Sequence, residues 1–111
     1  MSSIPPDIIL SNTEFVPGKE IVEFYGVVSG NTVRAKNIGR DILAGFKNIV
    51  GGELAGYTEL LQEAREEATA RMIEQARSVG ANAVINVRFA TSSIAQGASE
   101  LFAYGTAVQV R

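Results

Sequence analysis

Residues 58–80 read TELLQEAREEATARMIEQARSVG, and this stretch decides the fold. Its apolar residues recur at intervals of three and four, which is typical of one face of a helix. They are Leu61, Ala64, Ala68, Met72, Ala76 and Val79. Thr58 is placed to cap the first turn, and Gly80 is placed to end the last turn in a left-handed conformation. The spacing predicts a long amphipathic helix over residues 58–79.

Extended segments are predicted on both sides of this helix. Residues 8–10 form a brief apolar run, and residues 20–28 are rich in β-branched and aromatic side chains. Residues 83–91 and 101–110 alternate as strands do. The alternation places Ala83, Ile85, Val87 and Phe89 on one side of the third strand. The small polar residues 92–99 are expected to form a loop.

Two short segments punctuate the first half of the chain. Val16 to Lys19 carries Pro followed by Gly, the order of a type II turn. Ser29 to Thr32 interrupts the strand before Val33 and Arg34. Gly-Asn serves both a hairpin turn and a β-bulge, so these residues leave both readings open.

A second amphipathic helix is predicted over residues 37–50, ending at Gly51 and Gly52. Its apolar positions are Ile38, Ile42, Leu43, Phe46, Ile49 and Val50. A helix of about 22 residues spans roughly 33 Å, close to the length of a ten-residue strand. We therefore expect an α+β fold with two layers, in which the long helix covers one face of a sheet and residues 1–111 form a single domain.

The first long strand is apolar on both sides. Strict alternation places Val22, Phe24 and Val28 on one side and Ile21, Tyr25 and Val27 on the other. Leaving six such side chains in water would forfeit on the order of 10 kcal/mol, which is comparable with the stability of a whole domain. An identical partner is the simplest cover for the second face, and the alternative is that the helix over residues 37–50 suffices.

Composition limits the chemistry available to the chain. There is no Cys, His or Trp, which removes disulfides, thiol nucleophiles and the commonest zinc and copper ligands. Without histidine, a general acid–base catalyst would need a strongly shifted Glu, Asp or Lys, so we expect no enzyme. The net charge of −2, with no dense basic run, disfavours nucleic-acid binding. No apolar run approaches 20 residues and the start lacks a signal pattern, so a soluble cytoplasmic protein is expected.

Charge is segregated along the middle of the chain. Residues 34–47 hold Arg34, Lys36, Arg40 and Lys47 against Asp41, and residues 53–67 hold Glu53, Glu59, Glu63, Glu66 and Glu67 against Arg65. We hypothesise that the two regions meet within or between subunits, and the alternative is two ordinary solvated helix faces. Glu63 and Glu67, one helical turn apart, are the candidate ligands for a hard metal ion. The ion-pair spacings of Glu67 with Arg71 and of Glu74 with Arg77 favour a solvated face instead.

Six short motifs run through the chain in order. They are VVSGNTVR (27–34), NIGRDILAG (37–45), NIVGGEL (48–54), GYT (56–58), GANAV (80–84) and YGTAV (104–108). In these motifs the sequence closely resembles the YbjQ-like family of small bacterial proteins. The resemblance implies a dodecin-like β-α-β-β subunit, with a long helix on an antiparallel sheet, and a ring-shaped homopentamer built by additional short strands. It also implies that residues 29–32 are absorbed in or beside a long strand.

The family has no established activity, and its members are often labelled "putative heavy-metal-binding". The label fits this chain poorly, because soft metals favour thiolate, thioether or imidazole ligands and the only such groups are Met1 and Met72. The leading interpretation is a homo-oligomer that binds a small ligand or ion between subunits, through contacts that would involve Arg34, Arg40, Asp41 and Glu53. The alternative is a carboxylate-based metal-binding module. Neither interpretation identifies a cofactor.

Overall fold

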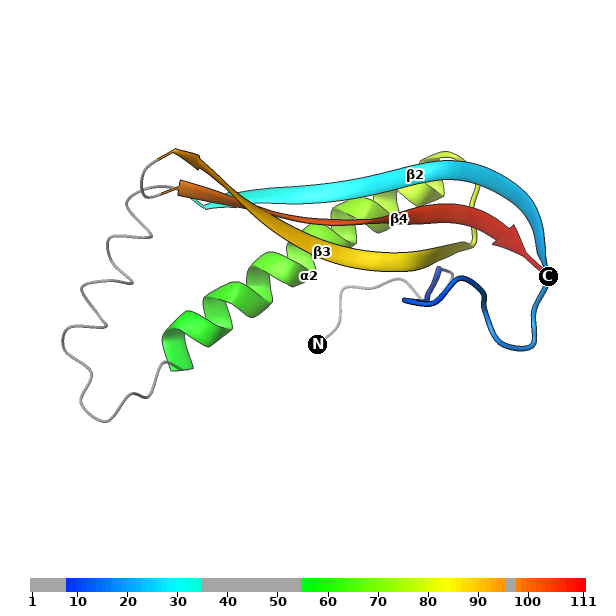
Figure 1. Cartoon of the computed structure of the whole chain (residues 1–111), viewed down its shortest axis with the longest axis horizontal. Coiled ribbons are helices and arrows are strands. Elements are labelled where there is room, and N and C mark those ends of the chain that lie inside the picture. Colours follow the sequence, from blue (N-terminus) through cyan, green and yellow to red (C-terminus); the bar gives the residue numbers. More distant parts are fainter. Residues whose placement is uncertain (1–7, 35–54, 96–97) are drawn as a thin grey trace.

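The computed structural model describes residues 8–34, 55–95 and 98–111. The elements in these ranges are β1 (Ile9–Leu10), β2 (Ile21–Arg34), α2 (Ala55–Ser78), β3 (Ala83–Ala95) and β4 (Ala98–Val110). The three long strands curve side by side and α2 runs obliquely along one side of them (Figure 1). The α+β class is therefore confirmed, while the helix expected over residues 37–50 lies outside the described residues.

The sheet has the strand order β1-β3-β4-β2. β4 pairs antiparallel with both β3 and β2, as expected. β1, however, pairs parallel with β3, so the sheet is mixed and the antiparallel prediction holds only for the three long strands. A two-residue strand carries no directional pattern, and its parallel direction is defined by backbone hydrogen bonds from the Ile9 N–H to the carbonyl of Asn82 and from the Ser11 N–H to the carbonyl of Val84.

The long helix forms where the apolar spacing predicts it, although its ends differ. α2 begins at Ala55, so Thr58 lies inside the helix and the prediction that it caps the first turn is wrong. At the other end Gly80 has φ +90° and its N–H donates to the carbonyl of Arg77, while the N–H of Ala81 donates to that of Ala76. These two bonds form a Schellman motif, which confirms Gly80 as the terminating residue.

The core lies between α2 and the sheet, and small residues dominate it. The largest cluster of buried side chains contains Ile8, Val28, Ala68, Met72, Ile73, Ala76, Ala81, Val84, Ala103 and Ala107. Four members of the predicted helix stripe, from Ala64 to Ala76, are buried. Its two ends, Leu61 and Val79, are exposed, because the first turns of α2 diverge from the sheet (Figure 1) and Val79 follows the last helical residue.

Residues 29–32 continue β2 without interruption. Pairing with β4 advances one residue at a time from Val27 opposite Thr106 to Arg34 opposite Ser99. Neither the hairpin turn nor the bulge considered for this segment is present, and the long strand implied by the family resemblance is confirmed. Gly30 allows α2 to pack closely on β2, because a Cβ atom at this position would lie 2.3 Å from backbone atoms of the helix. Glycine in a strand marks such a close approach.

β3 and β4 form a longer hairpin than the sequence indicates. β3 continues to Ala95 and β4 begins at Ala98, with Thr91 opposite Leu101 and Ser93 opposite Ser99. The loop predicted over residues 92–99 is therefore wrong. Small polar side chains weaken β propensity, but the ladder of backbone hydrogen bonds between the two strands overrides it.

Bulges change which side chains share a face. Two register shifts, between Ile21 and Glu23 and between Phe24 and Gly26, reverse the alternation in between. Phe24 therefore lies on the same face as Val27, not with Val28 as strict alternation predicts. A third shift, between Ile85 and Arg88, has the same effect in β3. It turns Val87 and Phe89 away from the face that carries Ala83 and Ile85, because a bulge inserts an extra residue.

The segment between β1 and β2 folds back along the sheet. The N–H of Lys19 donates to the carbonyl of Val16 at 3.0 Å and Gly18 has φ +77°, which confirms the type II turn. Further along, the N–H groups of Asn86 and Val87 donate to the carbonyls of Thr13 and Ser11. The segment is thus held against β3 by its own backbone. Within the described ranges, no helix is both long and apolar enough to cross a membrane.

Candidate interaction surface

The sheet has a second face, opposite α2, which we call the outer face. The strand register places alternate residues of all three long strands on it. From β2 these include Val27 and Val33, and from β4 they include Tyr104, Thr106, Val108 and Val110. The alternation predicted over residues 101–110 is confirmed, because Ala103 and Ala107 pack into the core beneath α2 and Gly105 between them is also buried.

One end of the outer face is covered by the chain itself. Val16, in the segment before β2, packs with a second cluster of buried residues that comprises Ala83, Ile85, Val108 and Val110, with Ile9 against its edge. Val16 and Val110 are 6% and 3% exposed. This contact accounts for the apolar outer side chains at the carboxyl end of β4, and it explains why the turn at Gly18 is needed to return the chain to the sheet.

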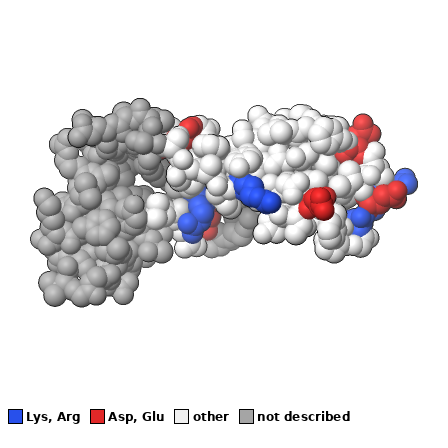
Figure 2. Space-filling view, viewed as in Figure 1, with Lys and Arg blue, Asp and Glu red and all other residues white. Residues whose placement is uncertain are grey.

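The rest of the outer face is left uncovered by the described residues. Val27 is 77% exposed, Phe24 71%, Val33 52% and Tyr104 37%. These four residues, which we call the outer strip, lie along β2 and its neighbour β4. On the one face that Figure 2 shows, in the same view as Figure 1, charged side chains are widely spaced over the middle of the described part and gather toward the end that carries the carboxyl terminus. A group of exposed apolar side chains of this kind is typical of a protein interface.

Polar groups interrupt the outer face at two points. The Asn31 amide donates to Glu100 Oε2 at 2.6 Å, and the Ser92 hydroxyl donates to Glu100 Oε1 at 3.4 Å. Glu100 is therefore held between both neighbouring strands. The Arg88 guanidinium donates to the carbonyl of Asn12 at 2.8 Å and helps to hold the segment before β2. These contacts position side chains on an exposed surface.

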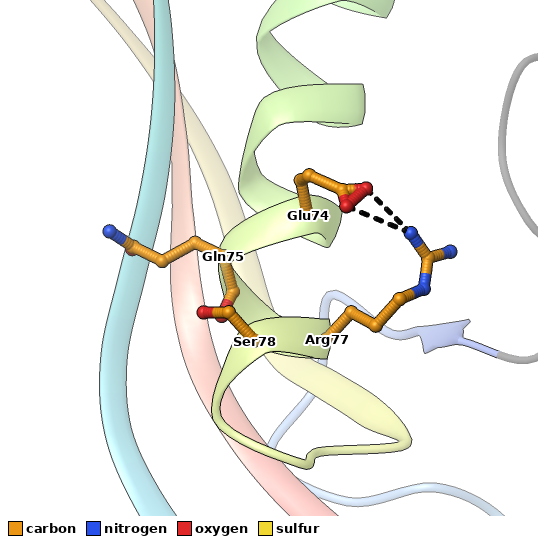
Figure 3. Close-up of polar contacts among 4 residues, drawn as sticks. All are labelled: Glu74, Gln75, Arg77 and Ser78. Carbon is orange, nitrogen blue, oxygen red and sulfur yellow. Dashed lines mark hydrogen bonds and ion pairs between the residues drawn. The ribbon is translucent and has the colours of Figure 1, made fainter.

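Polar side chains of α2 reach the edge of β2 that faces away from β4. The backbone N–H of Ser29 donates to Gln75 Oε1 at 2.7 Å, and the Arg71 guanidinium donates to the carbonyl of Asn31. Figure 3 shows Gln75 extending toward β2, while Glu74 and Arg77 project from another side of the helix. Sequence patterns do not predict these contacts, because the contacts join residues at least 40 positions apart in the chain.

The structure describes three of the six site residues predicted from sequence. Arg34 is the last residue of β2, where its backbone pairs with Ser99. Glu63 and Glu67 are exposed on α2. Arg40, Asp41 and Glu53 lie outside the described residues, and so does the rest of the basic region, residues 35–47, with which the acidic residues are predicted to pair.

Glu63 and Glu67, the candidate ligands for a hard metal ion, lie on an exposed face of α2 that also carries ion pairs. Glu67 forms an ion pair at 3.4 Å with Arg71, which lies one helical turn further along α2. Glu74 pairs with Arg77 at 2.7 Å, and both pairs are predicted by the spacing of the residues. In residues 8–34, 55–95 and 98–111, no group of three or more His, Cys, Asp or Glu could hold a metal ion. Met72, one of the two thioethers, is fully buried in the core and cannot reach a surface site.

The chain is similar to several proteins whose names state no biochemical activity. A "UPF0145 protein" of Hahella chejuensis is 67% identical over 101 residues, which cover 91% of this chain and 97% of the relative. Proteins of the same name from Halorubrum lacusprofundi and Archaeoglobus fulgidus are 62% and 61% identical, over 92% and 95% of this chain and 98% and 97% of theirs.

A solved structure shares the fold at low sequence identity. It is a protein of unknown function from Pediococcus pentosaceus, which is 12% identical and superposes with a TM-score of 0.51. The match covers 94% of this chain and 98% of that chain. The model of the YbjQ family, described as "Putative heavy-metal-binding", matches residues 8–111. This chain therefore belongs to the YbjQ family.

Proposed function

We propose that this chain works as a cytoplasmic homo-oligomer whose copies bury the outer strip. The observation that supports it is the exposure of Phe24 and Val27, which are adjacent on the outer face and more than two-thirds exposed. Burying one such side chain contributes about 1.5–3 kcal/mol, so a contact that repeats in every copy gains several such increments. A second copy is the natural occupant, because most assemblies of small proteins are symmetric and formed from one chain.

The finer features of the proposal rest on the family. Five copies in a ring, each a dodecin-like β-α-β-β unit, is the arrangement that the resemblance implies. The order β2-α2-β3-β4 and the packing of α2 on one sheet face support the subunit part of this proposal. A small ligand or ion between copies is the accompanying hypothesis. Its support is the segregation of basic residues in 34–47 from acidic residues in 53–67.

The family label does not extend to this proposal. Heavy metals prefer sulfur and imidazole ligands, and the chain has neither cysteine nor histidine. The carboxylates that remain would suit a hard ion, but Glu67 is already paired with Arg71. The donor set of this chain therefore disagrees with heavy-metal binding, and assembly has the stronger support.

Native mass spectrometry and sedimentation of untagged protein test the assembly. We expect one discrete oligomer at micromolar concentration, with any retained ligand visible as added mass. Phe24→Glu and Val27→Glu should shift the protein to monomer while preserving its circular dichroism spectrum, because both side chains are exposed in the single subunit. Leu61→Glu is the matched control, since Leu61 is 42% exposed on α2 and away from the outer face.

Two results would overturn the proposal. One is a parent protein that sediments as a monomer at micromolar concentration. The other is a discrete oligomer that survives both outer-strip substitutions but dissociates in the Leu61→Glu control, because that result would place the contact on the helix side.

A further inference from the structure

β2 is the last strand in the order β1-β3-β4-β2, so in the described part of the chain its far edge has no partner strand. It is 14 residues long. An edge of that length offers a row of backbone N–H and C=O groups to any extended polypeptide, including another copy of the same strand. Natural proteins avoid aggregation between exposed strand edges by blocking those edges with bulges, charged residues or covering segments.

The centre of this edge is already occupied by two side chains of α2. Gln75 accepts the hydrogen bond of the Ser29 N–H, and Arg71 donates to the carbonyl of Asn31. Ser29 and Asn31 are two residues apart, so their backbone groups point to the same edge of the strand. A partner strand would use these same two groups, and it could pair there only by displacing both side chains.

The close approach of the helix makes this arrangement possible. Gly30 lies between the two capped residues, and a Cβ atom there would be 2.3 Å from Ala68 O and from Met72 N. The backbone of α2 thus crosses β2 at this point. Arg71 and Gln75 are one helical turn apart on the same side of α2, which lets both side chains reach round the strand. Glu67 lies 3.4 Å from Arg71 and helps to hold the guanidinium.

The two bulges protect the part of the edge nearer the start of β2. They lie between Ile21 and Glu23 and between Phe24 and Gly26, and each disrupts the regular spacing that a partner strand needs. The regular segment of β2 runs from Gly26 to Arg34, and the capped groups lie within it.

We propose that Arg71 and Gln75 close the edge of β2 to strand addition, so that copies of this chain meet through the outer strip and not by pairing strands along this edge. The closure itself does not depend on the proposed function. Only the choice between the two modes of association rests on it, and the experiments below separate the two.

Amide hydrogen exchange at Ser29 tests the closure directly. We expect Gln75→Ala to accelerate exchange of this amide by about fivefold or more, the equivalent of one net hydrogen bond. Gln75→Glu, which keeps an acceptor oxygen, should retain most of the protection. Glu74→Ala is the control, because Glu74 is the neighbouring residue on α2 and pairs with Arg77 instead of the sheet. If Gln75→Ala exchanges at the rate of the control, the closure is refuted.

Association of the Arg71→Ala, Gln75→Ala double variant tests the consequence. We expect added self-association that increases with concentration and carries the infrared band of intermolecular sheet, and we expect it also in a Val27→Glu background, where the outer strip is blocked. The proposed function can fail without this result changing, since a monomeric parent would still acquire sheet extension in the double variant. A folded double variant that sediments as the parent does, in both backgrounds, overturns the proposal.

Discussion

A methyl group added to Gly30 would lie 2.3 Å from the backbone carbonyl oxygen of Ala68. Neither atom belongs to a flexible side chain, so the strand and the helix can relieve the overlap only by separating. Overpacking a core by one methyl group usually costs about 1–3 kcal/mol. We expect Gly30→Ala to destabilise the protein by about 3 kcal/mol, as measured by urea unfolding. Ser29→Ala, with an exposed side chain on the same strand, should change stability by less than about 0.5 kcal/mol.

Thr32 presents a buried hydroxyl with no hydrogen-bond partner among the described residues. Valine has almost the same shape and favours strands. Because an unpaired buried polar group costs free energy, Thr32→Val should leave stability unchanged or raise it by about 1 kcal/mol in thermal or chemical unfolding.

Thr69 is the matched comparison for that substitution. It is buried on α2, and its hydroxyl donates to the carbonyl of Arg65 at 2.7 Å. Thr69→Val removes a bond that is made, so it should lower stability by about 0.5–1.5 kcal/mol. A loss at Thr32 equal to that at Thr69 would contradict the expectation and indicate that the Thr32 hydroxyl is paired.

Asn82 fastens the end of β4. Its amide nitrogen donates to the carbonyl of Val110 at 2.9 Å, and its amide oxygen accepts from the Val110 N–H at 2.8 Å. The side chain thereby imitates a residue of a neighbouring strand. We expect Asn82→Ala to cost about 1–3 kcal/mol and to speed exchange of the Val110 amide. Asn31→Ala, which removes an exposed amide from β2, is the control and should cost little. Equal losses for the two variants would be the contrary result.

Metal titration follows from the donor set. Calorimetry of untagged protein with Zn²⁺ or Cd²⁺ should give no saturable heat, because the chain offers no cysteine or histidine. If Ca²⁺ or Mn²⁺ gives a saturable signal, the Glu63→Gln, Glu67→Gln variant decides whether these helix carboxylates are responsible. A stoichiometric soft-metal site would show that the donor argument is wrong.

The sequence predicts those parts of the fold that local physics controls. The helix stripe from Ala64 to Ala76, the turn at Gly18 and the termination at Gly80 each depend on a few neighbouring residues, and all three are confirmed. The apolar character of both sides of β2 is confirmed in the same way, since Val28 is buried under α2 while Val27 is exposed on the outer face.

What the sequence misses depends on contacts between distant segments. The bulges of β2 and β3 exchange the faces of Phe24 and Phe89, and alternation alone cannot detect an inserted residue. A clue is present in β3, where Asn86 has φ +54°, since asparagine tolerates this conformation better than most residues. Gly30 is a second clue, in this case to the close approach of α2. The neighbouring residues 29–32 indicate a break in the strand, whereas the strand is continuous and the glycine leaves room for the backbone of α2.

The candidate surface was predicted only in outline. An uncovered apolar face was expected, but the partial cover by Val16 and the reach of Gln75 to Ser29 require the three-dimensional arrangement. The ion pairs of Glu67 with Arg71 and of Glu74 with Arg77 are predictable from sequence. Residues one helical turn apart are neighbours wherever the helix lies.

The meeting of α2 with β2 at Gly30 also limits how this protein can evolve. Where two backbones are almost in contact, no small side chain is available to absorb a gradual change in volume. A lineage that replaced this glycine would have to raise the whole helix, and with it the grip of Arg71 and Gln75 on the strand. Neighbouring positions on the two elements are therefore expected to vary together or not at all.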